Sequence, residues 1–291
     1  MNPNVQSRHY DTADGLACHY LFWPNPHSDS CCLLLHGFTN DAHIWDDLAV
    51  QLQTQHNVIA VDFRGHGDSD WDPEARYTHP QLVADILALT SQQAFSRYHI
   101  IGHSLGARVA LLMLVEHADL AASLTIIDTG PEVRAVGVDK VRKDAENMPT
   151  RFDSIDAYYQ FLSGIYWFAD AGRLRKLAQF GLRRDEKEGW ICKTDPAFTA
   201  ALWKSGKPLG GSQDLRYPMN DQLWHALETL ACPALVIRGQ ASAILSPAVA
   251  RRMIEVIPDG RLLTIDKAGH AVMVDNPLAF EQGVLDFLGQ L

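Results

Sequence analysis

The sequence of 291 residues is poor in cysteine, and its few cysteines argue against two kinds of stabilising site. Their number, five, is odd, and no CxxC pair or Cys/His spacing typical of a zinc site connects them. A chain of this length buries a large apolar core and needs neither a disulfide framework nor a metal for stability. We therefore expect no metal and reduced, mostly buried cysteines. They are Cys18, Cys31, Cys32, Cys192 and Cys232.

Long apolar runs and positive charge are also scarce, which limits the possible partners. No stretch of about 18 apolar residues is present, the length that suggests a membrane-spanning helix. The first residues are polar and lack the basic segment and apolar run of a secretory leader. The 25 Lys and Arg against 35 Asp and Glu leave a charge of −10, which a phosphate backbone repels. We expect a soluble cytoplasmic protein that binds neither membranes nor nucleic acid.

What the chain does contain is a regular alternation of short apolar runs with longer helical patterns. This alternation is typical of an α/β fold, in which helices cover both faces of a mostly parallel, twisted sheet. Each apolar run ends at a polar residue or a glycine, and such strand ends open into the functional crevice of this fold class. The runs are 31–35, 58–61, 99–101, 124–127, 235–237 and 262–265, and helices are expected near 43–54, 80–95, 105–117, 247–256 and 277–289.

Between residues 131 and 225 the alternation stops. No apolar strand run occurs there, and aromatic residues such as Tyr158, Phe161 and Trp190 are frequent. The segment is therefore expected to form a helical cap inserted into the core. The predicted organisation is a first core part over 1–130, the cap over 131–225, and a second core part over 226–291.

A candidate nucleophile stands in Gly102-His103-Ser104-Leu105-Gly106, which follows an apolar run and begins an amphipathic helix. This strand-turn-helix context is what a nucleophile elbow requires, because the tight turn exposes the serine hydroxyl above the sheet. The glycines on either side let the backbone pass close to the neighbouring strand and helix. An ordinary helix start is the alternative interpretation of the same motif.

A serine hydroxyl needs a base within hydrogen-bond reach, and in this fold the base comes late in the chain. His270 follows the apolar run 262–265 and precedes the last helix, which makes it the candidate base. The oxyanion that forms on the attacked carbonyl needs preoriented donors. We expect the backbone N–H groups of Leu105, directly after the nucleophile, and of Phe38, in the loop after 31–35, to supply them.

These motifs together resemble the capped branch of the α/β-hydrolase family. His36-Gly37-Phe38, the turn 62–69, the elbow 102–106 and Gly269-His270 stand in the order that is usual for this family. The resemblance implies that the turn 62–69 shapes the fold near the active site without reacting. It also argues against dehalogenases and epoxide hydrolases of this fold, which have an aspartate at the position of Ser104.

The acid that should orient His270 departs from the commonest family pattern. The loop 239–246, where an aspartate is usual, contains no carboxylate, and position 243 is alanine. Asp128 closes the run 124–127 instead, and a branch of the family uses an acid there. Structural roles for Asp128, such as capping the turn that follows, remain an alternative, as do orienting roles for Asp266 and Asp275.

The predicted function is a serine hydrolase that cleaves a carboxylic ester through an acyl-enzyme, with Ser104, His270 and Asp128 as a triad and without a cofactor. The partner is expected to be a small apolar acyl substrate. Hydrolysis of an amide or C–C bond, as in relatives resembling meta-cleavage product hydrolases, and a non-catalytic ligand-binding role remain open. Candidate pocket residues are His103, Tyr159, Tyr166, Trp167 and Trp203.

Overall fold

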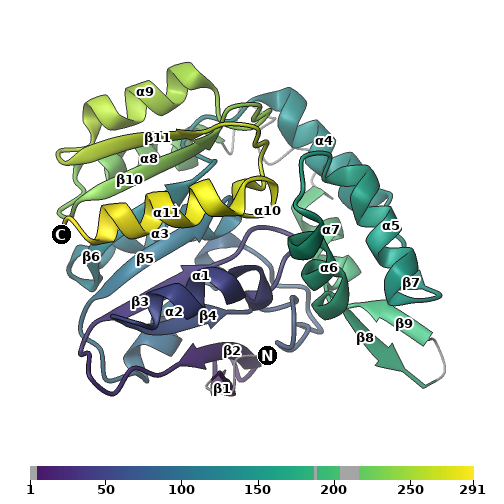
Figure 1. The fold of residues 1–291 in the computed structure, drawn as a ribbon. Helices are drawn as coiled ribbons and strands as arrows, with labels where there is room; N and C mark the ends of the chain where they lie inside the picture. The colour runs from purple at the N-terminus through teal and green to yellow at the C-terminus, as the bar shows by residue number, and fades with distance from the viewer. Residues whose placement is uncertain (1–4, 187–188, 204–215) are drawn as a thin grey trace.

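The computed structural model describes residues 5–186, 189–203 and 216–291 and has a central sheet of eight strands among them (Figure 1). The strand order is β1-β2-β4-β3-β5-β6-β10-β11. All pairs from β4 to β11 are parallel, whereas β2 is antiparallel to both β1 and β4. The expected α/β fold with a mostly parallel sheet is confirmed. The strands are β1 (Gln6–Asp11), β2 (Ala17–Trp23), β3 (Cys31–Leu35), β4 (Asn57–Val61), β5 (Tyr98–His103), β6 (Ala121–Ile127), β10 (Ala234–Gly239) and β11 (Gly260–Ile265).

Helices cover both faces of this sheet, and neighbouring strand residues therefore belong to different cores. Leu33 and Leu35 of β3 pack under one set of helices, while Cys32 and Leu34 pack under the other. Burial on both faces explains why these strands are continuous apolar runs. The first set is α2 (His79–Ser91), α3 (Leu105–Glu116), α8 (Arg216–Glu228) and α9 (Pro247–Val256), and the second is α1 (Asp46–Leu52), α10 (Val272–Asp275) and α11 (Pro277–Leu288).

Three of the expected helix starts are capped as the sequence indicates. The side chains of Thr78, Ser246 and Asn276 accept the N–H three residues later, and a proline occupies the first turn of each helix. Two short 3-10 helices, Ala42–Trp45 and Ala118–Leu120, complete the connections within the core. The five cysteines are buried and free, as expected.

The segment after β6 is mostly helical and also holds a small sheet that the sequence did not indicate. Its strands form an antiparallel sheet of order β7-β9-β8. They are only two to four residues long, which is too short for a periodic pattern to identify. The elements are α4 (Ala135–Glu146), β7 (Arg151–Phe152), α5 (Ile155–Ile165), α6 (Ala171–Phe180), β8 (Leu182–Asp185), β9 (Gly189–Cys192) and α7 (Pro196–Trp203).

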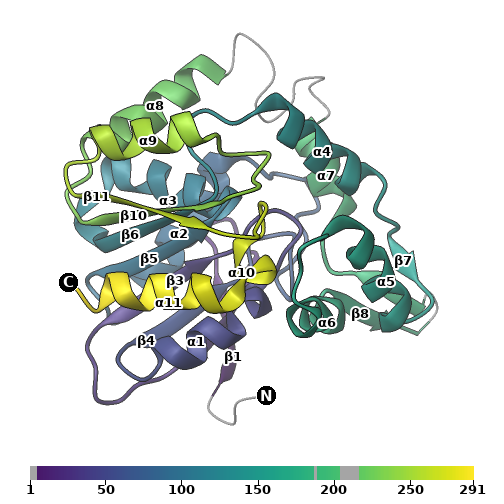
Figure 2. The same ribbon diagram turned by 45° about the horizontal axis from the view of Figure 1, so that its top comes forward.

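Helix α8 lies at the expected end of the cap but packs with the core. It contacts α3 and α9, and Figure 2 shows it beside α9, away from α5 and α6. The expected boundary at residue 225 therefore falls inside a helix that covers the sheet. The division of the chain into core and cap domains stays a prediction. Within the described ranges, no helix is long and apolar enough to cross a membrane.

Candidate active site

Ser104 lies in the turn that joins β5 to α3, with φ 51° and ψ −111°. This left-handed conformation is uncommon for a residue with a side chain and marks a strained turn. A Cβ on Gly102 would stand 2.6 Å from the backbone of Ala107, and one on Gly106 would stand 2.3 Å from the carbonyl oxygen of Leu35. The elbow therefore forms only because both flanking positions are glycine.

His270 lies in the loop after β11, and its ring joins two other predicted residues. The Nε2 atom is 3.1 Å from Ser104 Oγ, and the Nδ1 atom is 2.8 Å from Asp128 Oδ2. In the tautomer that fits, Nδ1–H donates to the carboxylate and Nε2 accepts from the serine hydroxyl. The structure thus brings Ser104, His270 and Asp128 into one chain of hydrogen bonds.

Asp128 directly follows β6 and is fully buried, with φ 50°. Besides His270, its carboxylate accepts the Ser242 hydroxyl at 2.6 Å and the Gly239 N–H at 3.0 Å. Strand β6 lies between β5 and β10, so the carboxylate sits between the elbow and the loop 239–246. That loop, which has no acid of its own, supplies hydrogen-bond donors to Asp128.

The two aspartates nearest to His270 in sequence have other contacts. Asp266 is exposed, and its backbone carbonyl accepts the Asn276 amide at 2.9 Å. Asp275 accepts the Gly269 N–H at 2.7 Å and so stabilises the loop that carries His270. Neither carboxylate hydrogen-bonds to the His270 ring, within the part of the chain that the structure describes.

The two candidate oxyanion donors belong to the two segments that meet at Ser104, the start of α3 and the loop after β3. Leu105 is the first residue of α3, and the N–H groups of a first helical turn have no intrahelical acceptor. Phe38 lies in the loop after β3, where a Cβ on Gly37 would stand 2.4 Å from His103 Nδ1 and 3.3 Å from Ser104 Cβ. Asn40 fixes this loop, because its side-chain amide donates to the Phe38 carbonyl at 3.0 Å. A glycine at 37 is thus required for the loop to approach the serine.

Helix α7 packs on this loop through Phe198, which is fully buried. Its ring stacks on Phe38 with 5.5 Å between the centroids and also contacts the rings of His66 and Tyr77. Just before it, Asp195 donates its N–H to the Gly65 carbonyl at 2.8 Å and accepts the Tyr77 hydroxyl. Sequence reasoning missed this contact, because it joins positions that are far apart in the chain.

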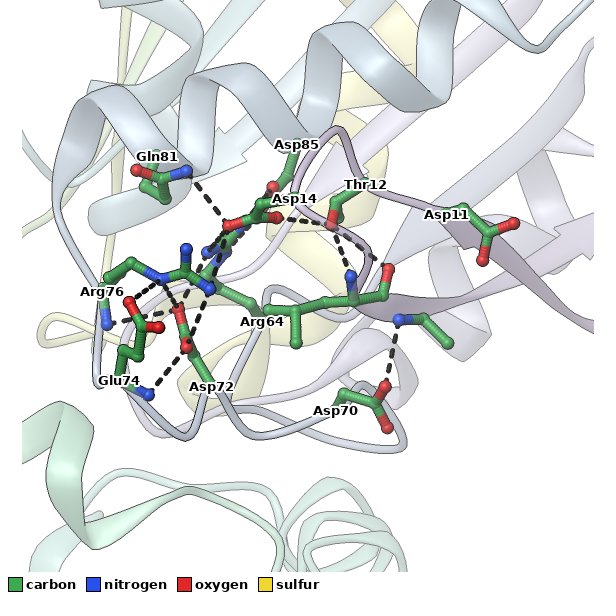
Figure 3. Close-up of polar contacts among 12 residues, drawn as sticks. Asp11, Thr12, Asp14, Arg64, Asp70, Asp72, Glu74, Arg76, Gln81 and Asp85 are labelled. Atoms are coloured by element: carbon green, nitrogen blue, oxygen red, sulfur yellow. Dashed lines mark hydrogen bonds and ion pairs between the residues drawn. The ribbon is translucent and has the colours of Figure 1, made fainter.

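A cluster of ion pairs around Arg64 stabilises the turn after β4. This Arg64 cluster consists of Arg64, Arg76, Asp14, Asp72 and Asp85 (Figure 3). Arg64 is fully buried, and its guanidinium donates to Asp85 at 2.6 Å, to Asp14 at 2.9 Å and to Asp72 at 3.2 Å. The hydrogen bond from Arg64 lowers the pKa of Asp14 to about 2. Two guanidinium groups thus face three carboxylates, and these ion pairs fix the turn. That the turn 62–69 takes no part in the reaction stays a prediction from the resemblance.

One group of side chains in the described residues has a spacing that could suit a metal ion: His19, Asp62 and Asp68. Its contacts are already satisfied within the protein. His19 donates to Asp62 at 2.7 Å and its other ring nitrogen is 2.9 Å from Ser7 Oγ, while Lys193 pairs with Asp68 at 2.7 Å. The hydrogen bonds account for this group without an ion.

A cavity of about 520 Å³ lies over Ser104 and His270, between the core loops and the segment α4 to α6. Of the predicted pocket residues, His103, Tyr166 and Trp167 line it. Tyr159 faces away and packs under Arg175, whose guanidinium carbon is 4.1 Å from the ring centroid, whereas its neighbour Tyr158 lines the cavity. The Trp203 side chain lies outside the described residues. Other lining residues include Val141, Met148, Leu162, Ile165, Phe168 and Ile244.

The charged side chains of the cavity were not identified from the sequence. Asp41 is 5% exposed and Asp275 is partly buried, and burial raises the pKa of each carboxyl to about 6. Asp144 pairs with Lys140 at 2.6 Å. Burial lowers the pKa of His103, whose Nε2 donates to the His270 carbonyl at 3.0 Å. At neutral pH the cavity therefore carries more negative than positive charge.

Comparison with known proteins agrees with the fold. The model of the alpha/beta hydrolase family matches residues 32–282. A 2-(acetamidomethylene)succinate hydrolase of Mesorhizobium japonicum is 27% identical over 88% of this chain and 87% of its own length. Esterase YbfF of Escherichia coli is 26% identical over 91% of this chain and 95% of its own. The crystal structure of an alpha/beta hydrolase from Novosphingobium aromaticivorans superposes with a TM-score of 0.85 at 25% identity, covering 99% of both chains. The chain belongs to the alpha/beta hydrolase family.

Proposed function

We propose that this hydrolase cleaves carboxylic esters through an acyl-enzyme, with Ser104 as nucleophile, His270 as general base and Asp128 as the acid that orients it. The observation that carries the proposal is the chain of hydrogen bonds from Ser104 through His270 to Asp128, at 3.1 and 2.8 Å, beneath a largely apolar cavity. The similarity to esterase YbfF of Escherichia coli gives further support. The proposed substrate is a small acyl ester of the size of this cavity.

The chemistry follows from the positions of these groups. Nε2 of His270 removes the hydroxyl proton as Ser104 Oγ attacks the ester carbonyl. The carbonyl oxygen becomes an oxyanion, which the N–H groups of Phe38 and Leu105 stabilise. Nε2–H then protonates the departing alcohol, leaving an acyl-serine. Water, deprotonated by the same histidine, releases the carboxylic acid and restores Ser104.

A fluorophosphonate probe and a panel of p-nitrophenyl esters from acetate to palmitate test the proposal. We expect labelling of Ser104 and rapid hydrolysis of the shorter esters, since the cavity is partly enclosed. Ser104→Ala and His270→Ala should each reduce turnover by about 10⁴- to 10⁶-fold while the fold is retained. More than a few per cent of wild-type turnover in folded Ser104→Ala would exclude this serine as the nucleophile.

A second candidate function is the hydrolysis of an amide or C–C bond on the same residues. The hydrolase of 2-(acetamidomethylene)succinate, similar over most of both chains, favours it. Including an anilide and a vinylogous diketone in the panel separates the alternatives, since the preferred bond should show the highest kcat/KM. A protein that only binds ligands would leave the fluorophosphonate unreacted.

A further inference from the structure

The cavity over Ser104 has an unbalanced set of charges. Its lining contains three carboxyl groups, those of Asp41, Asp144 and Asp275, and one ammonium group, that of Lys140. Lys140 already pairs with Asp144 at 2.6 Å. Asp41 and Asp275 form no ion pair in the part of the chain that the structure describes, although the charges of His43 and Lys193 act to lower the pKa of Asp41.

The two unpaired carboxylates are held in place by backbone groups of core loops. Asp41 accepts the His43 N–H at 2.9 Å, and Asp275 accepts the Gly269 N–H at 2.7 Å. Each bond occupies one carboxylate oxygen and leaves acceptor capacity on the other. His103, which also lines the cavity, adds no compensating charge, because burial lowers its pKa well below the usual value.

Aromatic rings of the segment between β6 and β10 lie over the same cavity. Tyr166, Trp167 and Phe168 line it, and the ammonium of Lys140 stands 5.9 Å from the centroid of the Trp167 ring. Aromatic faces attract cations and offer nothing to a carboxylate. The carboxylates and the ring faces of the cavity therefore both favour a ligand with a positive charge.

We propose that this cavity selects substrates by charge, preferring esters that carry a quaternary or protonated ammonium group, accepting neutral esters less well, and rejecting esters that carry a carboxylate. The proposal rests on the proposed esterase function and narrows its substrate class. A carboxylate near Asp41 or Asp275 would meet like charge at low dielectric, and the cavity has no unpaired cation among the described residues to compensate. The relative from Mesorhizobium japonicum is named for a succinate derivative, which is an anion. The proposal therefore gives this chain a charge preference opposite to the one that the relative's name suggests.

Three esters of similar shape measure the preference: butyrylcholine, its neutral analogue 3,3-dimethylbutyl butyrate, and 3,3-dimethylbutyl hydrogen succinate. Values of kcat/KM are divided by the rate constants of hydroxide-catalysed hydrolysis, which removes differences in intrinsic reactivity. Dissociation constants with Ser104→Ala protein give a readout that does not need catalysis. We expect the cationic ester to exceed the neutral one, and the neutral one to exceed the anionic one, by at least about tenfold at each step.

Asp275→Asn and Asp41→Asn identify the groups responsible, because asparagine keeps the hydrogen bond to the loop N–H and removes the charge. Each should lower the ratio of cationic to neutral ester several-fold and improve the anionic ester. Asp266→Asn is the matched control: it removes an exposed carboxylate that does not line the cavity and should leave the ratio unchanged.

Equal affinity of Ser104→Ala protein for the cationic and neutral esters, or better binding of the anionic one, would overturn the charge preference. An unchanged ratio in both Asp275→Asn and Asp41→Asn would do the same. Failure of the esterase function gives a different pattern: no ester is hydrolysed and Ser104 is not labelled, while the dissociation constants still rank the three charges.

Discussion

Replacing Asp128 by asparagine tests the least usual part of the proposed site. Oδ2 of Asp128 accepts from His270 Nδ1 at 2.8 Å and from the Ser242 hydroxyl at 2.6 Å, and Oδ1 accepts the Gly239 N–H at 3.0 Å. All three partners are donors to a side chain that is fully buried. An asparagine side chain would put one oxygen and one NH₂ group at the positions that the two carboxylate oxygens, Oδ1 and Oδ2, now occupy.

In either orientation of the introduced amide, its NH₂ group faces another hydrogen-bond donor. With its NH₂ group toward His270, the ring must accept on Nδ1, so that Nε2 carries hydrogen and no longer accepts from Ser104. With the NH₂ group toward the sheet, it meets the Gly239 N–H, and the negative charge that would stabilise the imidazolium is missing in both cases. We expect kcat to fall by about 10²- to 10⁴-fold, or about 3 to 5 kcal/mol of transition-state stabilisation, with little change in KM.

The assay is the steady-state hydrolysis of p-nitrophenyl butyrate by wild-type protein and by Asp128→Asn, Asp266→Asn and Asp275→Asn, with circular dichroism as a check of folding. Asp266→Asn should behave as wild type. Near-wild-type kcat in folded Asp128→Asn, combined with a large loss in Asp266→Asn or Asp275→Asn, would refute the assignment of the orienting acid.

Three other results are expected. Phe198→Ala should lower the free energy of unfolding by about 3 to 5 kcal/mol. It should also reduce kcat, because Phe198 packs on Phe38, a proposed oxyanion donor. Phe198→Leu should have a smaller effect on both quantities, which chemical denaturation and ester kinetics measure. Asp14→Asn should be about 1 to 2 kcal/mol less stable than wild type at pH 7, since solvent partly screens this carboxylate. Because the pKa of Asp14 is lowered in the folded protein to about 2, this difference should persist above pH 4 and disappear as the pH falls toward 2 in urea titrations. The ratio of kcat/KM for butyrylcholine to that for its neutral analogue should decrease between pH 7.5 and 5.5, since burial raises the pKa of Asp41 and Asp275 to about 6 and both become protonated in this range. A flat ratio would exclude titration of these carboxyls.

Much of the fold could be predicted because each β-strand of the parallel sheet is a continuous apolar run with a polar end. The elbow around Ser104 is a local sequence pattern. His270 could be predicted because the base follows the nucleophile late in the chain in this fold. Asp128 could be proposed because the loop 239–246 has no acid and a buried strand ends at residue 128. The structure supplied the hydrogen bonds that join these residues.

The cavity lining could not be predicted to the same degree, because it depends on how the helices after β6 are rotated above the sheet. Tyr158 and Tyr159 are adjacent on α5, and about 100° of helical rotation separates their directions. Sequence periodicity does not show which of the two faces the cavity. From the sequence, Asp275 is considered only as an alternative partner of His270. Its partial burial arises from neighbouring segments, which local sequence does not reveal.

The Arg64 cluster also constrains how this protein can be recombined with its relatives. Its members come from the turn between β1 and β2, the long connection after β4, and helix α2. A chimaera with a junction between residues 14 and 85 would separate a buried guanidinium from some of its carboxylates, and an uncompensated buried charge costs about 3 to 5 kcal/mol. The segment from residue 14 to residue 85 should therefore come from one parent protein, and junctions for segment exchange should be placed after α2.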